Sequence, residues 1–246
     1  MILNYFVDWA SDNVSSSEDA LKYLYSRGVS NDQILRYKIG YISEAYDPIS
    51  ELDVNHTELC NENLKQGCDT CRFKYFLAGN RLRESIVLPL TSYSKKIIGV
   101  QLRSIKEKRY ESFMIQNRSE SYFFGLSPSM DRIWSREEIA ITEGPFDALA
   151  LDKTGLFPVV ALTTNTSNEN QTRFLRRFVK KVYLFLDLDQ AGRDGASKIS
   201  NKLNDKDVQI VNYKHNSFSV KDLNELWSRC GDERFQHHIK SVLGMK

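Results

Sequence analysis

The chain has 246 residues, 41% of them hydrophobic and 27% charged, a composition typical of a folded protein with one or two domains. Its 34 basic and 32 acidic residues nearly balance, so the net charge of +2 excludes a protein coated in basic residues but allows local phosphate-binding patches. There is neither an apolar run of membrane-spanning length nor a secretion signal at the first residues. The four cysteines do not have the arrangement of a secreted disulfide framework, so we expect a reducing cytoplasm and no membrane partner.

The first part of the chain predicts a subdomain that mixes helices and strands. Amphipathic patterns indicate helices over residues 18–27 and 31–37, whereas no element is predicted for residues 1–17. Residues 43–72 are polar, are predicted to be irregular, and contain three of the four cysteines. The pattern from 85 to 102 predicts two strands joined by a turn.

After a boundary near residues 130–137, strands and helices alternate. The predicted strands are 139–142, 158–161, 182–186 and 208–211, and the predicted helices are 145–153, 168–178, 191–203 and 232–242. Such alternation is typical of a mostly parallel sheet flanked by helices. We therefore expect an α/β protein with two domains, an N-terminal subdomain over 1–134 and a second domain over 135–246.

The strand predicted over 182–186 leads directly into two carboxylates, Asp187 and Asp189, and then into Gly192. Side chains two residues apart on a strand point to the same face, so these carboxylates should project together. Two adjacent carboxylates repel each other unless a cation lies between them, and Mg²⁺ prefers such oxygen ligands. The alternative is that both aspartates cap the following helix.

Two further acidic motifs follow strands. Glu143 comes directly after the predicted strand 139–142, Asp147 lies about one helical turn later, and Asp222 follows the predicted strand 208–211. Because the carboxyl ends of parallel strands meet at one edge of a sheet, these groups should converge with Asp187 and Asp189. We expect Asp187 and Asp189 as metal ligands, Glu143 as a ligand or general base, and Asp147 and Asp222 as secondary ligands, unless all are caps and surface groups.

Basic and aromatic residues gather in the preceding segment. The basic residues are Arg81, Arg83, Lys95, Lys96, Arg103, Lys106, Lys108 and Arg109, with Tyr93, Tyr110, Tyr122 and Phe123 among or just beyond them. Such a combination binds a single nucleic-acid strand through phosphate contacts and base stacking. The alternative is a solvated charged face.

A cysteine-containing segment has part of the spacing of a zinc site. His56, Cys60, Cys68 and Cys71 include one Cys-x2-Cys pair, which can bind one side of a tetrahedral Zn²⁺. In a short irregular segment, metal binding would supply folding free energy. The alternative is three reduced thiols in a loop and a surface histidine.

The motifs and their order resemble a known family. The sequences Glu143-Gly-Pro-Phe-Asp147, Asp187-Leu-Asp189-Gln-Ala-Gly192 and Lys221-Asp222-Leu-Asn-Glu225 resemble the Toprim domain of topoisomerases, primases and some nucleases. The segments at 20–28, 34–41, 81–83, 88–89, 98–103, 108–112 and 124–126 resemble the catalytic core of DnaG-type primases. The resemblance extends over residues 18 to 230.

The resemblance implies an α+β basic subdomain followed by a Toprim domain, with a groove between them that holds single-stranded DNA template. It implies that Mg²⁺ or Mn²⁺ assists the joining of ribonucleoside triphosphates into short RNA primers. By the same resemblance, Arg81, Arg83 and Arg103 would contact template or incoming nucleotide, and Lys108 and Arg109 belong to the same nucleic-acid-binding set. The chain departs from the family at Ser85, where relatives usually carry another arginine.

The resemblance also raises an expectation about partners. Relatives usually carry a zinc ribbon ahead of the core, whereas this chain starts almost at the core. It has no Gly-x4-Gly-Lys-Ser/Thr loop of a helicase motor and leaves little room for a helicase-docking domain. We therefore expect a helicase or zinc-module partner in trans, in the cytoplasm of a bacterium, with a phage or mobile element as the source.

Two other functions remain open at this point. A Toprim nuclease would use the same acidic residues, but it would not need the basic module over 73–126. A topoisomerase would also need a nucleophilic tyrosine on a further domain, for which there is no room. A non-catalytic accessory that binds single-stranded DNA would not need the acidic set.

Overall fold

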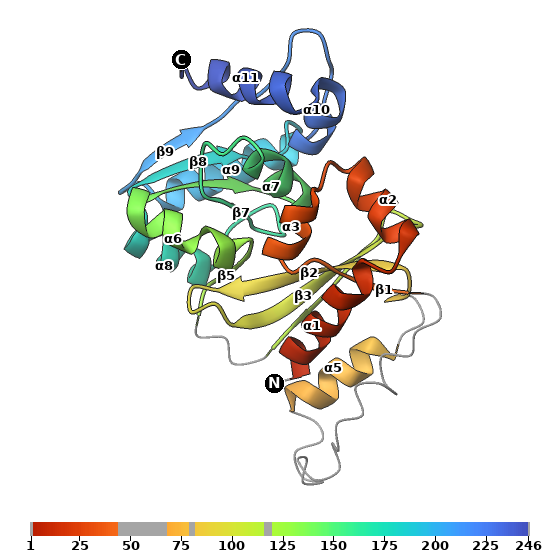
Figure 1. The fold of residues 1–246 in the computed structure, drawn as a ribbon. Coiled ribbons are helices and arrows are strands. Elements are labelled where there is room, and N and C mark those ends of the chain that lie inside the picture. The colour runs from red at the N-terminus through yellow and green to blue at the C-terminus, as the bar shows by residue number, and fades with distance from the viewer. Residues whose placement is uncertain (1, 44–67, 79–81, 116–119, 246) are drawn as a thin grey trace. The chain divides into compact units, whose positions relative to one another are not determined.

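The computed structural model describes residues 2–43, 68–78, 82–115 and 120–245. It divides into two compact units that interleave along the chain (Figure 1). The first unit comprises Met1–Tyr23, Asn31–Leu90 and Ile97–Arg118, and the second comprises Leu24–Ser30, Thr91–Lys96 and Ser119–Lys246, within the described ranges. The domain boundary at residues 134 and 135 stays a prediction.

The first unit contains a small sheet with helices beside it. The elements that lie in it, wholly or in part, are α1 (Ile2–Val14), α2 (Glu18–Ser26), α3 (Asn31–Arg36), β1 (Gly40–Ile42), α5 (Asp69–Leu77), β2 (Ser85–Ser92), β3 (Ile97–Ser104) and β4 (Tyr110–Met114). Strand β3 lies between β2 and β4, and β1 pairs antiparallel with β2. Both helices predicted in this part of the chain, and both strands, are confirmed.

Helix α1 was not predicted, although its sequence carries a helical pattern. Its buried residues are Leu3, Phe6, Val7, Ala10 and Val14, which recur at helical spacing and form one apolar face. That face packs into the core of the first unit together with the adjacent α5 (Figure 1).

The prediction that residues 43–72 are irregular is wrong at its end, because α5 begins at Asp69. Phe73 of this helix is fully buried, with its ring centroid 5.0 Å from that of Phe6 and 4.8 Å from that of Phe113. Burial of such rings stabilises this helix, which the polar segment before it does not predict.

The second unit has the predicted alternation of strands and helices. Its elements are β5 (Tyr122–Phe124), α6 (Leu126–Arg136), β6 (Glu138–Thr142), α7 (Pro145–Asp152), β7 (Val159–Ala161), α8 (Glu169–Phe178), β8 (Lys181–Phe185), α9 (Gln190–Lys202), β9 (Asp207–Ile210), α10 (Leu223–Cys230) and α11 (Asp232–Val242). Each predicted strand and helix of this half ends within one residue of its predicted bounds. Strand β5 and helices α6 and α10 were not predicted.

The strands of this unit run in the order β5-β7-β6-β8-β9. Strands β7, β6, β8 and β9 are parallel, and β5 is antiparallel to β7. The chain passes from β6 to β7 on one side and then to β8 on the other, so the direction of winding reverses between β6 and β8. Ligands of parallel sheets bind at such a switch point, outside the carboxyl ends of the strands. The predicted α/β fold is confirmed.

Strand β8 is buried on both faces. Val182, Leu184 and Leu186 join the core that α6, α8 and α9 cover. On the other face, the Phe157 ring lies 4.5 Å from that of Tyr183 between centroids. Burial on both faces explains the continuous apolar run in the sequence. No helix in the described ranges is both long and apolar enough to cross a bilayer.

Candidate active site

The acidic residues that follow β6 and β8 emerge at the same edge of the sheet. Thr142, the last residue of β6, lies opposite Phe185, the last residue of β8, so Glu143 and Asp187 leave the sheet as near neighbours. Burial, and then the negative charges of Asp187 and Asp189, raise the pKa of Glu143 to about 7. Its Oε2 atom is buried and has no hydrogen-bond partner. The site therefore holds a carboxyl oxygen that is buried without a hydrogen-bond donor.

Asp187 and Asp189 converge on one cation that the chain itself supplies. The Nζ atom of Lys221 lies 3.2 Å from Oδ2 of Asp187 and 3.3 Å from Oδ2 of Asp189. Strand alternation does not cause this convergence, because β8 ends at Phe185 and the two aspartates lie in the turn beyond it. Asp189 is also the N-cap of α9, where its Oδ1 accepts a 2.9 Å hydrogen bond from the Gly192 amide. The capping alternative is thus confirmed for Asp189, and metal binding by the pair stays a prediction.

The two aspartates differ in their electrostatic surroundings. Burial raises the pKa of Asp187 and outweighs the opposing effect of Lys221. The hydrogen bond from Gly192 lowers the pKa of Asp189, which is more exposed. Hydrogen bonds to both aspartates raise the pKa of Lys221, so its ammonium is charged at any working pH.

Asp147 lies in the first turn of α7, and Asp222 is the N-cap residue of α10. Oδ1 of Asp147 accepts a 2.9 Å hydrogen bond from the Asn224 amide, and Asp222 caps α10 by accepting from the Glu225 amide at 2.7 Å. Burial, and then the charge of Asp222, raise the pKa of Asp147 to about 8. The structure therefore brings all five predicted acidic residues into one electrostatically coupled cluster.

Sequence reasoning did not assign roles to Tyr213 and Lys221, which shape this cluster. The Tyr213 hydroxyl donates to the Leu186 carbonyl at 3.0 Å, and the Lys221 carbonyl accepts from the Leu188 amide at 2.9 Å. These bonds fasten the segment that carries Lys221 to the end of β8. Lys221 lies within a recognised motif, but nothing local in the sequence marks Tyr213.

The acidic cluster fits a divalent cation. Its donors are carboxylate oxygens, the ligands that Mg²⁺ and Mn²⁺ prefer, and the buried Oε2 of Glu143 lacks a partner. In the part of the chain that the structure describes, no three His, Cys, Asp or Glu side chains form a ready-made metal site. Cation binding therefore requires some rearrangement of these side chains.

Gly192 is required by close packing, and its replacement gives a testable effect. A Cβ atom at this position would lie 2.0 Å from the carbonyl oxygen of Asp187. We expect Gly192→Ala to lower the free energy of unfolding by about 3 kcal/mol or more, measured by urea denaturation, because backbone must shift. Gly155→Ala is the control: Gly155 has φ +66° but open space around its Cβ, so the expected loss is about 1 kcal/mol. Equal losses in the two variants would contradict this interpretation.

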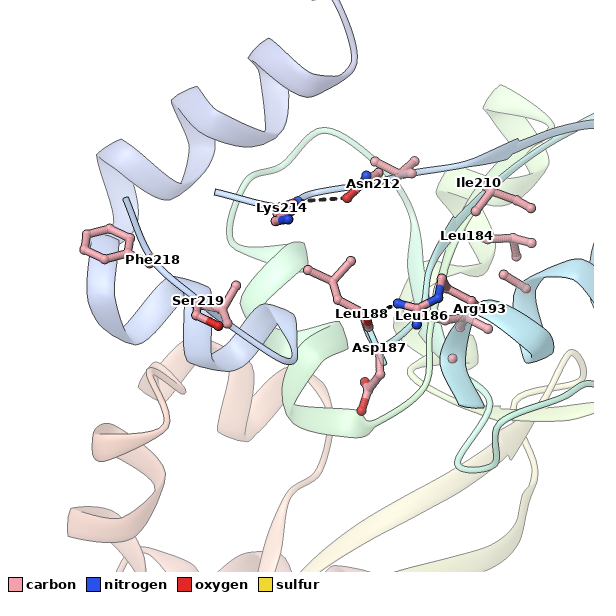
Figure 2. Close-up of a pocket in the computed structure, with 14 residues that line it drawn as sticks. Leu184, Leu186, Asp187, Leu188, Arg193, Ile210, Asn212, Lys214, Phe218 and Ser219 are labelled. Carbon is pink, nitrogen blue, oxygen red and sulfur yellow. Dashed lines mark hydrogen bonds between the residues drawn. The ribbon is translucent and has the colours of Figure 1, made fainter. Parts of the chain in front are cut away.

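A cavity of about 480 Å³ adjoins the acidic cluster. It is lined by ends of β8 and β9 and by the segment that follows β9, including Leu186, Ile210, Lys214 and Phe218. Asp187 is one of the lining residues, and Figure 2 shows its carboxylate directed away from the side chain of Leu188.

Of the residues predicted to contact template or nucleotide, Arg83, Arg103, Lys108 and Arg109 lie in the first unit, whereas Lys95 and Lys96 of the wider basic set lie in the second. Arg83 and Lys108 are exposed, and Arg109 pairs with Glu107 at 2.6 Å. Arg103 is only 7% exposed, and its Nε donates to the Tyr23 hydroxyl at 3.1 Å. Arg81 lies outside the described residues.

Arg103 also stacks over Tyr110, with its guanidinium carbon 4.7 Å from the ring centroid. Its Nη1 atom is buried without a hydrogen-bond partner. A buried guanidinium nitrogen without an acceptor is costly, and a phosphate oxygen would satisfy it. The nucleotide-binding role expected of Arg103 stays a prediction with this support.

The predicted zinc site is only partly within the described residues. Cys68 directly precedes α5 and Cys71 lies in its first turn, both half-buried. His56 and Cys60 lie outside the described residues. Zinc binding by this set stays a prediction.

Comparisons with known proteins agree with the motifs. Residues 9–126 match the N-terminal domain of the DNA primase catalytic core, and residues 140–227 match the Toprim-like model. The chain belongs to the DnaG-type primase catalytic cores. A DNA primase of Staphylococcus epidermidis is 27% identical to this primase core over 220 residues, which are 85% of the chain and 36% of that protein. The chain spans about a third of the length of the curated relatives it matches.

Solved structures share the fold of this primase core. An Aquifex aeolicus primase structure with zinc-binding and RNA polymerase domains superposes with a TM-score of 0.72 at 23% identity, covering 98% of this chain and 60% of that one. A DnaG primase catalytic domain bound to single-stranded DNA superposes with a TM-score of 0.72 at 19% identity, covering 98% and 77%. At these identities the likeness establishes the fold.

Proposed function

We propose that this primase core synthesises short RNA primers on single-stranded DNA by metal-dependent nucleotidyl transfer. The observation that carries the proposal is the acidic cluster at the switch point between β6 and β8, where Asp187 and Asp189 converge and Glu143 has a buried, unpartnered oxygen. Membership of the DnaG-type primase cores supplies the reaction class.

Each carboxylate has a distinct role in the proposal. Asp187 and Asp189 hold Mg²⁺ or Mn²⁺, with Asp147 and Asp222 as the more distant acidic groups. The cation, when bound, supplies charge neutralisation at the reacting triphosphate and a lower pKa for the attacking 3′-hydroxyl. Glu143, whose pKa is about 7, is suited either to complete the ligand set or to accept the hydroxyl proton near neutral pH.

Template and nucleotide contacts belong to the first unit. Arg103 offers a buried, unpartnered nitrogen, and Arg83, Lys108 and Arg109 lie on or near the same hairpin. The Ile105 amide donates to the Glu84 carbonyl at 2.9 Å, which holds the hairpin turn beside the segment of Arg83. Arg81 belongs to the same set by its sequence position. A related DnaG catalytic domain has been solved with single-stranded DNA, which is consistent with this assignment.

The proposed function also implies binding partners and a cellular location. We place the protein in the bacterial cytoplasm, working with ribonucleoside triphosphates and with a helicase or zinc-module partner in trans. A structural Zn²⁺ at the cysteine segment belongs to the same proposal. Co-purification with such a partner would support this part, and full processive priming by the isolated chain would count against it.

A product assay on single-stranded DNA tests the proposal and separates it from its rivals. The purified chain is incubated with labelled ribonucleoside triphosphates, template, Mg²⁺ or Mn²⁺ and, in a parallel reaction, a helicase. Short products that require both template and triphosphates are expected. Cleavage of the template without triphosphates would instead indicate a nuclease. Binding that persists in EDTA without any synthesis would indicate a non-catalytic accessory.

A further inference from the structure

The ammonium of Lys221 lies between two carboxylates of the acidic cluster. It lies about equally far from Oδ2 of Asp187 and Oδ2 of Asp189, at 3.2 and 3.3 Å. The other oxygen of Asp189 is taken by the Gly192 amide at 2.9 Å. The oxygen that Asp189 has available for a metal is thus the one that Lys221 contacts.

The backbone of Lys221 is held in place, whereas its side chain can leave. The Lys221 carbonyl accepts from the Leu188 amide at 2.9 Å, and its amide donates to Oε2 of Glu225 at 3.0 Å. The Lys221 side chain is 52% exposed, while that of Asp187 is only 14% exposed. A lysine ammonium is a compact charge on a flexible stem, so it can move away without disturbing the carboxylates.

A divalent metal and the Lys221 ammonium cannot bind the Oδ2 atoms of Asp187 and Asp189 at the same time. Mg²⁺ binds carboxylate oxygens at about 2.0–2.1 Å, so a metal on the two Oδ2 atoms would lie within the space of the ammonium. Two positive charges at such separation repel strongly in a partly buried site. Binding of the metal there therefore requires the ammonium to move.

We propose that Lys221 is an exchangeable internal cation, which holds Asp187 and Asp189 together and which a divalent metal must displace in order to bind. Lys221 then acts as a positioning residue that sets the metal affinity of the site. This inference rests on the proposed function in that it takes these aspartates as metal ligands. It adds to that function that the metal competes with the Lys221 ammonium for the two aspartates.

Metal titration without nucleotide tests the inference. Lys221→Met keeps the length of the side chain and removes its charge, and Lys214→Met removes a charge from the same segment beside the neighbouring cavity. Isothermal titration with Mn²⁺ should give a dissociation constant about tenfold lower for Lys221→Met than for the wild type, and an unchanged one for Lys214→Met. An equal or higher dissociation constant in Lys221→Met would overturn the inference.

A second measurement uses the wild-type chain, so that misfolding of a variant cannot decide the outcome. Lysines are briefly acetylated with and without Mg²⁺, and labelling is quantified by peptide mass spectrometry. Labelling of Lys221 should rise at least threefold with Mg²⁺, while that of Lys214 stays constant. Unchanged labelling of Lys221 in saturating Mg²⁺ would overturn the inference. Primer synthesis by the wild type is scored separately, so failure of the proposed function is distinguishable from failure of this inference.

Discussion

Replacement of Asp187 by asparagine is expected to reduce primer synthesis at least about 1,000-fold without unfolding the protein. The activity loss follows from the proposed role of Asp187, because the variant removes the negative charge of a proposed metal ligand, and a factor of 1,000 corresponds to about 4 kcal/mol of transition-state stabilisation. Stability should not fall, because burial raises the pKa of Asp187 and the folded surroundings thus disfavour its charge. Initial rates and thermal denaturation midpoints at pH 8 measure the two effects.

Asp207→Asn is the matched control for this prediction. Asp207 is an exposed aspartate on β9 that pairs with Lys181 at 3.5 Å, away from the acidic cluster. Its replacement should leave the rate of primer synthesis within about twofold, because exposed pairs contribute little. The account would be wrong if Asp187→Asn kept a tenth of the activity, or if it lost activity only in proportion to lost folded protein.

In EDTA, the stability of the chain should fall as the pH rises from about 5 to about 8. The pKa of Glu143 is raised from 4.5 to about 7 and that of Asp147 from 3.8 to about 8, so the folded chain binds protons that the unfolded chain has already released. This contribution to stability is therefore complete below the ordinary values of 4.5 and 3.8 and is lost as the pH rises from them to the raised values.

Two variants and added Mg²⁺ test whether the acidic cluster causes this pH dependence of stability. Glu143→Gln should flatten the slope, whereas Glu169→Gln, at an exposed position on α8, should keep it. Saturating Mg²⁺ should also flatten it, because a bound cation favours the ionised carboxylates. Urea denaturation at several pH values gives the result. A free energy of unfolding that stays constant or rises from pH 5 to 8 in EDTA would contradict the account.

The strands of the second unit could be predicted from sequence because their burial leaves a continuous apolar run within each strand. A strand that is buried on both faces must be apolar throughout, so residues 182–186 marked β8 to within one residue. The shared position of Glu143, Asp187 and Asp189 could be predicted for the same reason, since each follows such a run and parallel strands share their carboxyl edge, whereas their role in metal binding stays a prediction.

Features that depend on distant contacts could not be predicted in this way. The pairing of Lys221 with Asp187 joins residues far apart in the sequence, and so does the 3.2 Å hydrogen bond from Arg27 to Asn224. Helix α5 is stabilised by the burial of Phe73 against Phe6, a contact between residues far apart in the sequence. Helix α10 is hidden for a different reason: Asp222 and Glu225 at its start serve as its N-cap and first turn, and the same acidic motif also indicates a metal site.

The central claim is that the acidic edge of the second unit holds the cation that contacts the reacting phosphate. The most direct measurement compares primer synthesis from ordinary triphosphates with synthesis from those carrying sulfur at a non-bridging α-phosphate position, in Mg²⁺ and in Mn²⁺. Because Mn²⁺ accepts sulfur more readily than Mg²⁺, one diastereomer should react at least about tenfold more slowly in Mg²⁺ and recover in Mn²⁺. An equal slowing of both diastereomers in the two metals would contradict the claim.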